Sequence, residues 1–411
     1  MLYSLAAYAL LPWALLHLLW RARRQPAYLR HLGERFGFYE FSCGKPLIWI
    51  HAVSVGETRA AEPLIAALAE RHPDHAILLT HMTPTGRETS ETLYGDRIRR
   101  CYLPYDLPGA MRRFLHHFEP RVGIIMETEL WPNLLAACER NAIPVYLANA
   151  RLSERSARRY ARVAALTRRT LKRLRAIGAQ SERDAQRFDA LGAGAVTITG
   201  NIKFDRTPPA AQIELGAELR RLFGGGRRIF LAASTRDGEE ALVLDAIAQI
   251  DDPALLTVIV PRHPQRFDAV AALLAQRGIR ARRRSEQAQI DADTKVVLGD
   301  SMGEMFAYYI ASDFAFVGGS LLPLGGQNLL EACAAGRAVI VGPHTFNFEE
   351  ATESAIAAGA ALRVSDTSAL SSAIGELLRE QARRKQLGDA GLQFTGAHRG
   401  ATQRTLALLD L

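Results

Sequence analysis

Residues 46–68 read PLIWIHAVSVGETRAAEPLIAAL. Leu47–Ala52 is a short apolar run without helical periodicity, and an Ala- and Leu-rich helical pattern follows Thr58. The pattern predicts a buried strand, a tight turn and a helix. Ligands of open parallel sheets bind beyond the carboxyl ends of the strands, so Glu57 in the turn is expected to lie where a ligand or an acceptor group would bind. An acidic residue that stabilises the first turn of a helix is the alternative explanation.

The same alternation of short apolar runs and helical patterns continues along the chain. In the first half, strands are predicted at Leu47–Ala52, Ala76–Thr80, Arg99–Leu103, Val122–Glu127, Pro144–Asn149, Ala176–Gln180 and Val196–Gly200. In the second half, they are predicted at Ile229–Ser234, Leu255–Pro261, Lys295–Gly299, Phe314–Gly319, Ala338–Gly342 and Ala361–Val364. The alternation indicates doubly wound parallel α/β sheets, and 411 residues are enough for two such domains.

Breaks in this pattern predict the domain boundaries. The prediction is an N-terminal membrane anchor (1–24), a first Rossmann-like domain (25–206), a linker (207–226), a second Rossmann-like domain (227–382) and a C-terminal helix (383–411). The last helix is expected to pack back on the first domain.

The beginning of the chain differs from the rest in composition. Leu2–Trp20 is apolar apart from Ser4 and His17, and three arginines follow within four residues. A cleaved signal peptide carries its basic residues before the apolar region, so this order favours an uncleaved anchor with the rest of the chain in the cytoplasm. A helix lying in the membrane interface, with Trp13 and Trp20 at headgroup level, and an ordinary buried helix are the alternatives.

The net charge of +8 and a pI near 9.5 predict anionic partners. Residues 151–175 hold nine arginines and one lysine against one glutamate. A helix from Arg155 would place these residues on one side: Arg155, Arg158, Arg159, Arg162, Arg169 and Arg173. A solvated basic face is the ordinary explanation, but in a chain with an apolar anchor we expect attraction to anionic lipid. The four cysteines are widely separated, so neither a disulfide framework nor a zinc site is predicted.

The second half carries three candidate anion or nucleotide sites at predicted strand ends. Arg262 and His263 follow a strand and offer donors for a phosphate. The segment 301–305, SMGEM, opens a helix. The glycines of 318–320 and of 325–331, GGQNLLE, admit close approach of a ligand, although glycine pairs more often mark turns. The dinucleotide fingerprint is missing, which disfavours a nicotinamide enzyme.

The first half contributes the acidic residues Glu127 and Glu129 after a strand, and Lys203 near the domain boundary. A helix-end acidic cluster and a solvent-exposed lysine are the ordinary explanations of these residues. The histidines form no metal-ligating set, and no metal site or cofactor is predicted.

Eight motifs together resemble one family. They are HAVSVGE (51–57), THMTPTG (80–86), YLPYDLP (102–108), METELWPN (126–133), NARLS (149–153), GNIKFD (200–205), PRHP (261–264) and GGQNLLE (325–331). In this order they are similar to the motifs of the Kdo transferases, which move 3-deoxy-D-manno-octulosonic acid (Kdo) from CMP-Kdo to a lipid A precursor.

The resemblance implies a GT-B fold, in which two Rossmann-like domains flank the active site. It implies that Glu57 is the general base of an inverting transfer and that Glu127 and Lys203 stabilise the transition state. The implied CMP-binding residues are Arg262, His263, Gly303, Glu304, Met305, Asn328, Leu329, Leu330 and Glu331. It also implies an inner-membrane location, a phosphorylated lipid acceptor and no nucleic-acid partner. Because the leaving group is a nucleoside monophosphate, we expect no metal requirement.

Two other functions are compatible with these residues. One is a GT-B transferase that uses a UDP- or ADP-sugar, and the other is an anchored nucleotide-binding protein without catalysis, in which Glu57 is only a helix-end carboxylate. The sequence does not determine the number of Kdo residues transferred, the acylation of the acceptor, the oligomeric state, or whether residues 2–20 span the bilayer.

Overall fold

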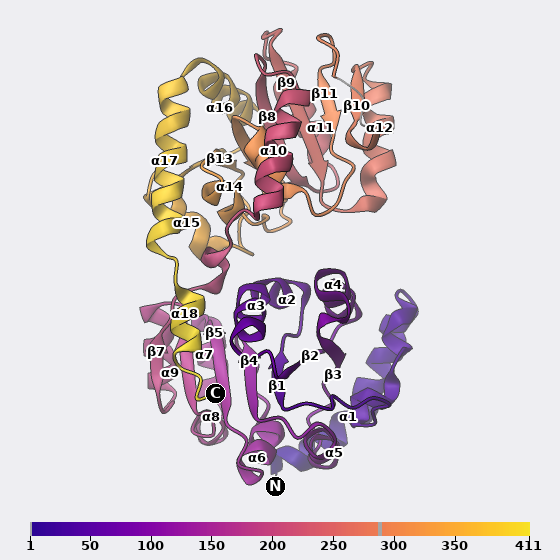
Figure 1. The fold of residues 1–411 in the computed structure, drawn as a ribbon, viewed down its shortest axis with the longest axis vertical. Coiled ribbons are helices and arrows are strands. Elements are labelled where there is room, and N and C mark those ends of the chain that lie inside the picture. Colours follow the sequence, from indigo (N-terminus) through magenta and orange to yellow (C-terminus); the bar gives the residue numbers. More distant parts are fainter. Residues whose placement is uncertain (1, 287–289) are drawn as a thin grey trace. The chain divides into compact units, whose positions relative to one another are not determined.

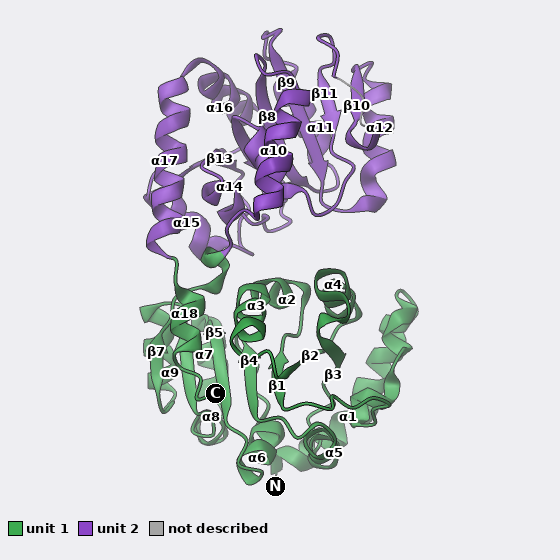
Figure 2. Cartoon of the chain, viewed as in Figure 1, with its two compact units in different colours: residues 1–205, 399–411 green, residues 206–398 purple. Residues whose placement is uncertain are grey.

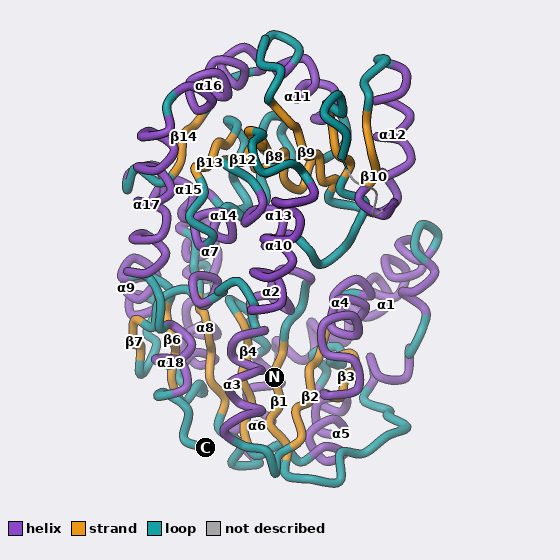
Figure 3. Tube along the Cα trace, turned by 45° about the horizontal axis from the view of Figure 1, so that its top comes forward, coloured by secondary structure: helices purple, strands orange, loops and turns teal. Residues whose placement is uncertain are grey.

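The computed structural model describes residues 2–286 and 290–411, which form two compact units (Figure 2). Unit 1 comprises Met1–Asp205 and Arg399–Leu411, and unit 2 comprises Arg206–His398. Each unit contains one parallel seven-stranded sheet with helices on either side (Figures 1 and 3). The expectation of an α/β fold with two doubly wound sheets is confirmed.

The sheet of unit 1 has the strand order β3-β2-β1-β4-β5-β6-β7. Its strands are β1 (Leu47–His51), β2 (Ala76–His81), β3 (Arg99–Tyr102), β4 (Val122–Met126), β5 (Val145–Ala150), β6 (Ala176–Ala179) and β7 (Val196–Ile198). Its helices are α1 (Leu2–Ala22), α2 (Val55–Ala60), α3 (Glu62–Arg71), α4 (Pro84–Tyr94), α5 (Pro108–Phe118), α6 (Pro132–Arg140), α7 (Glu154–Ala161), α8 (Ala164–Leu171), α9 (Glu182–Ala190) and α18 (Ala401–Leu406). Short 3₁₀ helices lie at η1 (Pro26–Leu29), η2 (Leu32–Phe36), η3 (Gly95–Arg97) and η4 (Ile202–Asp205).

Strand β1 is buried on both faces, as expected for the centre of a parallel sheet. Ile48 and Ile50 pack into the hydrophobic cluster on one face, while Leu47 and Trp49 pack into the cluster on the other. Trp49 also explains a glycine in the adjacent strand, because a Cβ at Gly123 would lie 2.7 Å from the indole ring. The apolar run Leu47–His51 therefore forms an interior strand of the sheet.

The sheet of unit 2 has the strand order β10-β11-β9-β8-β12-β13-β14. Its strands are β8 (Arg228–Thr235), β9 (Leu255–Pro261), β10 (Ala281–Arg283), β11 (Val296–Leu298), β12 (Phe314–Val317), β13 (Ala338–Val341) and β14 (Ala361–Arg363). Its helices are α10 (Ala210–Leu222), α11 (Glu239–Ile247), α12 (Phe267–Gln276), α13 (Met305–Ala311), α14 (Leu330–Ala334), α15 (Glu349–Ala357), α16 (Thr367–Arg379) and α17 (Gln381–Ala397). The 3₁₀ helices are η5 (Pro264–Arg266) and η6 (Arg284–Glu286). The core is centred on β8 and β12, where the rings of Phe230 and Phe314 stack at 5.4 Å.

Two segments differ in detail from their sequence-based descriptions. The predicted linker, 207–226, contains helix α10, which packs against α13. The last helical stretch is divided in two: α17 packs against α14 and β13 of unit 2, and α18 belongs to unit 1. The N–H of Gly400 donates to Asp205 at 2.7 Å, which fixes the returning chain at the start of α18.

The basic segment 151–175 does not form one helix, so the predicted single basic face is wrong. It forms α7 and α8, which are separated at Arg162 and Val163. The break is stabilised because the Thr167 hydroxyl donates to the carbonyl of Tyr160 at 2.8 Å. Beyond α8, Arg173 pairs with Glu139 at 2.9 Å and is only 11% exposed, so it takes no part in a solvated face.

Candidate functional site

The turn after β1 fixes Glu57 at the point in unit 1 where the strand order reverses. Ser54 caps helix α2, and its Oγ accepts a hydrogen bond from the N–H of Glu57 at 3.4 Å. In return, the Val53 N–H donates to Oε2 of Glu57 at 2.8 Å, and the Ser54 hydroxyl donates to Oε1 at 2.8 Å. Each carboxylate oxygen can accept one more hydrogen bond. The turn therefore orients the carboxylate and leaves it able to receive a proton.

The electrostatic surroundings of Glu57 favour its protonated form. Burial and the nearby charge of Glu127, with a smaller contribution from Glu129, raise the pKa of Glu57 to about 7, against the lowering effect of the hydrogen bonds from Val53 and Ser54. A carboxylate with a pKa near neutrality is a stronger base than an ordinary exposed glutamate. This is the protonation behaviour expected of a general base.

Glu127 and Lys203 meet at the ends of β4 and of the segment after β7. The Nζ of Lys203 lies 3.1 Å from Oε1 of Glu127. Glu127 has a left-handed backbone with φ of +57°, an uncommon conformation for a side chain of this size. Next to Lys203 in η4, the Ile202 N–H donates to Oδ1 of Asn149 at 3.0 Å, which holds η4 against the end of β5. The structure thus brings together two of the predicted site residues that are 76 positions apart.

Glu129, the second carboxylate of the METELWPN motif, has a different partner. It accepts a hydrogen bond from the indole N–H of Trp131 at 3.1 Å. Burial raises the pKa of Glu129, and Glu127 adds to this effect while the Trp131 hydrogen bond opposes it. The Trp131 ring also contacts the ring of His51, with 6.0 Å between the centroids. Glu129 and Trp131 therefore shape the loop that carries Glu127.

Two buried histidines support the Glu57 turn and received no role from the sequence. Nδ1 of His81 lies 2.9 Å from the carbonyl of Ala52, and Nδ1 of His51 lies 2.9 Å from Oγ1 of Thr80. Burial lowers the pKa of His51 to about 3 and that of His81 to about 4, so both are neutral near pH 7. Both residues lie in motifs that resemble the Kdo transferases, HAVSVGE and THMTPTG, and this membership was the feature of the sequence that could have indicated their role.

Arg262 and His263 follow strand β9 in unit 2. Nε of Arg262 donates to Oε1 of Gln327 at 3.2 Å, which joins the PRHP motif to the GGQNLLE motif. Burial lowers the pKa of His263, and the positive charges of Arg262, Arg236 and Arg266 lower it further. Several cationic groups thus gather at this strand end, as expected for a site that receives a phosphate.

Gly303 and Glu304 lie between β11 and helix α13, and Met305 is the first residue of α13. Glu304 accepts a hydrogen bond from the Ser301 hydroxyl at 2.6 Å and pairs with Arg284 at 3.4 Å. Gly303 has φ of +81°, a conformation that favours glycine. The N–H of Ala307 in the first turn of α13 donates to the side chain of Gln212 at 3.1 Å.

The four residues Asn328–Glu331 lead into α14, which begins at Leu330, and their side chains are of two kinds. Leu329 and Leu330 are buried, so they fix the backbone and do not offer side chains to a ligand. Oε1 of Glu331 pairs with Arg206 at 2.5 Å and lies 3.4 Å from Nδ2 of Asn328. Within this motif, the polar side chains of Asn328 and Glu331 are the candidates for ligand contact.

Glu239 is a further important residue of unit 2 that the sequence did not indicate. It is fully buried, and its carboxylate accepts hydrogen bonds from the backbone N–H groups of Ser320 and Leu321 at 2.9 and 3.0 Å. The N–H of Gly319 also donates to Glu239. The glycine turn at 318–320, a candidate anion site in the sequence, therefore binds an internal carboxylate with these N–H groups.

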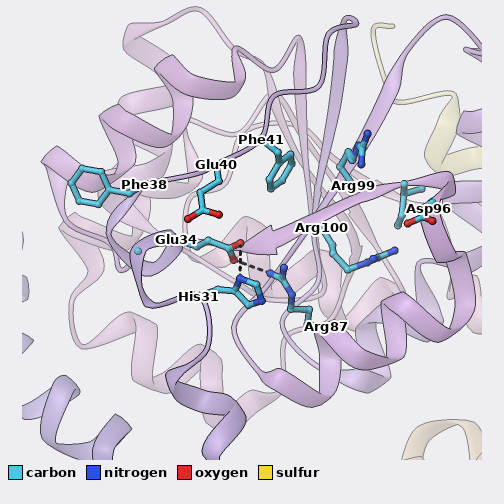
Figure 4. Close-up of a pocket in the computed structure, with 11 residues that line it drawn as sticks. His31, Glu34, Phe38, Glu40, Phe41, Arg87, Asp96, Arg99 and Arg100 are labelled. Carbon is cyan, nitrogen blue, oxygen red and sulfur yellow. Dashed lines mark hydrogen bonds and ion pairs between the residues drawn. The ribbon is translucent and has the colours of Figure 1, made fainter.

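A cavity of about 490 Å³ in unit 1 lies apart from the predicted site residues. Figure 4 shows its lining, in which Arg87 and His31 point toward the carboxylate of Glu34, while Arg99 and Arg100 come from the edge strand β3. Glu34 is 7% exposed and pairs with Arg87 at 2.8 Å. Since the buried carboxylate of Glu34 is already paired with Arg87, we assign no ligand to this cavity. Among the described residues, no group of three or more His, Cys, Asp or Glu could hold a metal ion.

Two doubly wound units, each built on a parallel seven-stranded sheet, define a protein of the GT-B fold. A solved glycosyltransferase from Rickettsia africae ESF-5 has the same fold, with a TM-score of 0.57 and 12% identity over 89% of this chain and 97% of that chain.

Sequence comparison gives the family. The model of the 3-deoxy-D-manno-octulosonic-acid transferases (kdotransferases) matches residues 30–206. The 3-deoxy-D-manno-octulosonic acid transferase of Bordetella pertussis is 45% identical, covering 99% of this chain and 98% of that protein. That of Haemophilus influenzae is 42% identical, covering 94% and 92%. The chain belongs to the Kdo transferase family, as its motifs predicted.

Proposed function

We propose that the protein transfers Kdo from CMP-Kdo to a lipid A precursor, lipid IVA, with inversion at the anomeric carbon. Unit 1 supplies the groups that act on the acceptor, and unit 2 binds the nucleotide. The observation that carries the proposal is the setting of Glu57, a carboxylate held by Val53 and Ser54 with its pKa raised to about 7.

In this mechanism, Glu57 removes the proton from the acceptor hydroxyl as its oxygen attacks the anomeric carbon of Kdo. The bond from that carbon to the phosphate of CMP breaks, and the electron pair leaves with CMP. An inverting transfer needs one base on the acceptor side and stabilisation of charge on the leaving side. Lys203, oriented by Glu127, is the cation we assign to that stabilisation.

We assign CMP to unit 2. The residues proposed to bind it are Arg262, His263, Gly303, Glu304, Met305, Asn328, Leu329, Leu330 and Glu331. Arg262 supplies charged donors for the phosphate, and Glu331 can accept hydrogen bonds from ribose hydroxyls. Leu329 and Leu330 act through their backbone, because their side chains are buried. We propose that no metal takes part, since one cation and backbone donors suffice for a monophosphate leaving group.

The acceptor and the location of the protein form one proposal. By its length and composition, helix α1 is long and apolar enough to cross a membrane. We propose attachment to the cytoplasmic side of the inner membrane, where the basic residues beside α1 face anionic lipid. The acceptor is then a phosphorylated lipid in the same membrane.

The test is mass spectrometry of lipid IVA after incubation with CMP-Kdo and wild-type protein, Glu57→Ala or Glu70→Ala. Glu70 is an exposed residue at the end of α3, so its variant is a matched control. We expect products heavier by one or more Kdo units with the wild type and Glu70→Ala only. We also expect the three proteins to bind CMP with the same affinity. Each of them should bind CMP more tightly than UMP or ADP. Equal transfer by Glu57→Ala would contradict the base assignment, and preference for UMP or ADP would contradict the donor.

A further inference from the structure

Helix α1 has one face covered by the protein along its whole length. The residues that are half-buried or buried recur at helical spacing: Tyr3, Ser4, Ala7, Leu11, Ala14, Leu15, Leu18 and Ala22. With a step of 100° per residue, they occupy an arc of about 120°. An isolated membrane-spanning helix beside a soluble domain would have no such stripe, so α1 is docked on unit 1 (Figure 1).

The opposite face of α1 is apolar and exposed. Its large residues include Leu5 (59% exposed), Leu10 (60%), Trp13 (65%), Leu16 (66%) and Trp20 (52%). Soluble proteins rarely expose a continuous apolar face of this kind. The helix is therefore apolar on all sides for two reasons. One face packs against the protein, and the opposite face needs an apolar partner other than the protein.

The beginning of α1 is attached to the globular part of unit 1 by specific hydrogen bonds. The Tyr3 hydroxyl donates to Oδ2 of Asp106 at 2.9 Å, and the Ser4 hydroxyl donates to Oδ1 of Asn133 at 2.8 Å. Asp106 is 7% exposed and also accepts from the N–H groups of Asn133 and Leu134 at the start of α6, at 3.0 and 2.8 Å. This end of α1 thus joins a rigid junction between the β3–α5 loop and helix α6.

The other end of α1 is fixed to the same unit through η1 and η2. Leu18 and Ala22 pack against Tyr28 of η1. In η2, Glu34 accepts a hydrogen bond from the backbone N–H of Tyr102 in β3 at 2.7 Å and pairs with Arg87 of α4, as Figure 4 shows. The end of α1 therefore packs on η1, and the chain continues directly into η2, which is bonded to the folded part of unit 1.

This attachment is incompatible with a helix that crosses the bilayer. Twenty-one residues extend for about 31 Å, so a spanning α1 would place its two ends on opposite sides of the hydrocarbon core. To keep the contacts of Tyr3 and Ser4, the Asp106–Asn133 junction would then have to lie on the far side of the membrane from η2. Carrying the charged surface of unit 1 into the core is strongly unfavourable.

We infer that α1 lies flat in the membrane interface, docked on unit 1 by its Tyr3–Ala22 face, and that its exposed face inserts into an anionic phospholipid surface. The inference rests on the membrane attachment proposed above and gives its geometry. Two aromatic residues on the inserted face, Trp13 and Trp20, suit the headgroup level. Arg23 and Arg24 are exposed beside the helix, where they meet lipid phosphates.

Cross-linking tests the docked position in native membranes. The variant Ser4→Cys/Asn133→Cys, in a Cys43→Ser background that removes the half-buried native thiol, should form a disulfide on mild oxidation, detected by peptide mass spectrometry. The control Leu5→Cys/Asn133→Cys places the first cysteine on the opposite, exposed face and should not cross-link. Two results together would overturn the inference. The first cross-link would be absent, and an impermeant maleimide would label Ser4→Cys and Asn133→Cys from opposite sides of the membrane. The readout does not depend on Kdo transfer, so failure of the proposed activity leaves it interpretable.

A second measurement uses the fluorescence of the natural tryptophans and does not depend on an introduced cross-link. Trp13 lies one residue from the midpoint of α1, and Trp20 lies near its end. In vesicles containing brominated lipids, the quenching that is lost in the single variants Trp13→Phe and Trp20→Phe gives the depth of the substituted residue, because Trp49 and Trp131 are present in every variant. A flat helix predicts that both residues are quenched best by shallow bromines. If Trp13 were quenched best by bromines at the bilayer centre, about 15 Å below the edge of the hydrocarbon core, α1 would span the membrane.

Discussion

The ammonium group of Lys203 lies 3.1 Å from the carboxylate of Glu127, although 76 positions separate the two residues in the sequence. Their side chains are 25% and 27% exposed, and neither belongs to the hydrophobic clusters. An ion pair of this exposure contributes little to stability, on the order of 0.2–1 kcal/mol. We therefore expect its main contribution in catalysis.

This expectation gives the first prediction. Lys203→Met should reduce the rate of Kdo transfer by about 10²- to 10³-fold, because it removes charge stabilisation at the leaving group. Its free energy of unfolding should change by only about 1 kcal/mol or less. Lys172→Met, at an exposed position, is the control and should keep full activity. A large loss of stability with normal transfer would assign the pair a structural role.

The pKa of Glu57 predicts a pH dependence. A general base acts when deprotonated, so kcat/KM should rise with pH around the pKa of about 7 and level off above it. In Glu127→Gln the midpoint should move to lower pH, because the charge of Glu127 raises the pKa of Glu57. The measurement is a pH–rate profile of both proteins, and identical midpoints would show that the two carboxylates are not coupled.

The same pKa has a consequence for stability, with the opposite sign to that of a salt-bridged carboxylate. In the folded protein Glu57 binds its proton up to a pH of about 7, whereas in the unfolded chain it releases it near 4.5. The unfolded state thus binds fewer protons in this interval, and the free energy of unfolding falls as pH rises through it. Melting temperatures of Glu57→Gln and the wild type, compared from pH 4.5 to pH 7, should therefore diverge in favour of the variant.

The role assigned to Arg262 can be tested by nucleotide binding. Arg262→Ala should weaken CMP binding by about 10- to 100-fold, as expected for the loss of a charged hydrogen bond. Arg277→Ala, an exposed residue at the end of α12, is the matched control. Calorimetric titration with CMP measures both variants, and unchanged affinity in Arg262→Ala would remove this residue from the donor site.

Glu239 is predicted to be a structural determinant of the donor unit. Glu239→Gln should lower the free energy of unfolding by about 1.5–3 kcal/mol, because the charge-assisted hydrogen bonds to Ser320 and Leu321 are weakened in a buried place. Glu349→Gln also changes a glutamate in the first turn of a helix, but at an exposed position, and should have little effect. Denaturant unfolding of the two variants gives the comparison, and equal stabilities would contradict the prediction.

The last prediction concerns metals. Kdo transfer should continue in the presence of EDTA, because we assign charge stabilisation to Lys203 and to backbone donors. If EDTA abolished transfer and Mg²⁺ restored it, the proposed metal-independent mechanism would be wrong. Zn²⁺ added after EDTA is a control for nonspecific effects of divalent ions.

The strands were predictable from the sequence because most of them are short apolar runs buried on both faces. Strand β10 was not, since its sequence, Ala281–Arg283, is two-thirds arginine and lies at the edge of the sheet, where little burial is required. The division of the basic segment into α7 and α8 also escaped prediction, because it depends on the hydrogen bond from Thr167 to Tyr160. The periodicity of residue types indicates which residues share one face of a helix, but it does not indicate where the helix ends.

The candidate site was predictable only as a set of separate motifs. Residue types and strand ends indicated Glu57, Glu127 and Arg262, but the contact between Lys203 and Glu127 depends on the order of the strands in the sheet. Glu239 followed by Glu240 looks like an ordinary acidic first turn in the sequence. Its burial against the turn at 318–320 is a tertiary feature that no local pattern contains.

The return of the chain to unit 1 has a consequence for biosynthesis. Ala401 and Leu406 of α18 belong to the hydrophobic cluster that contains Ile48 and Ile50, so the core of unit 1 is incomplete until α18 is made. A ribosome adding about 5–20 residues per second needs about 10–40 s to pass residues 206–398. Helix α1 is synthesised before α18 and can therefore meet the membrane before the core of unit 1 is complete.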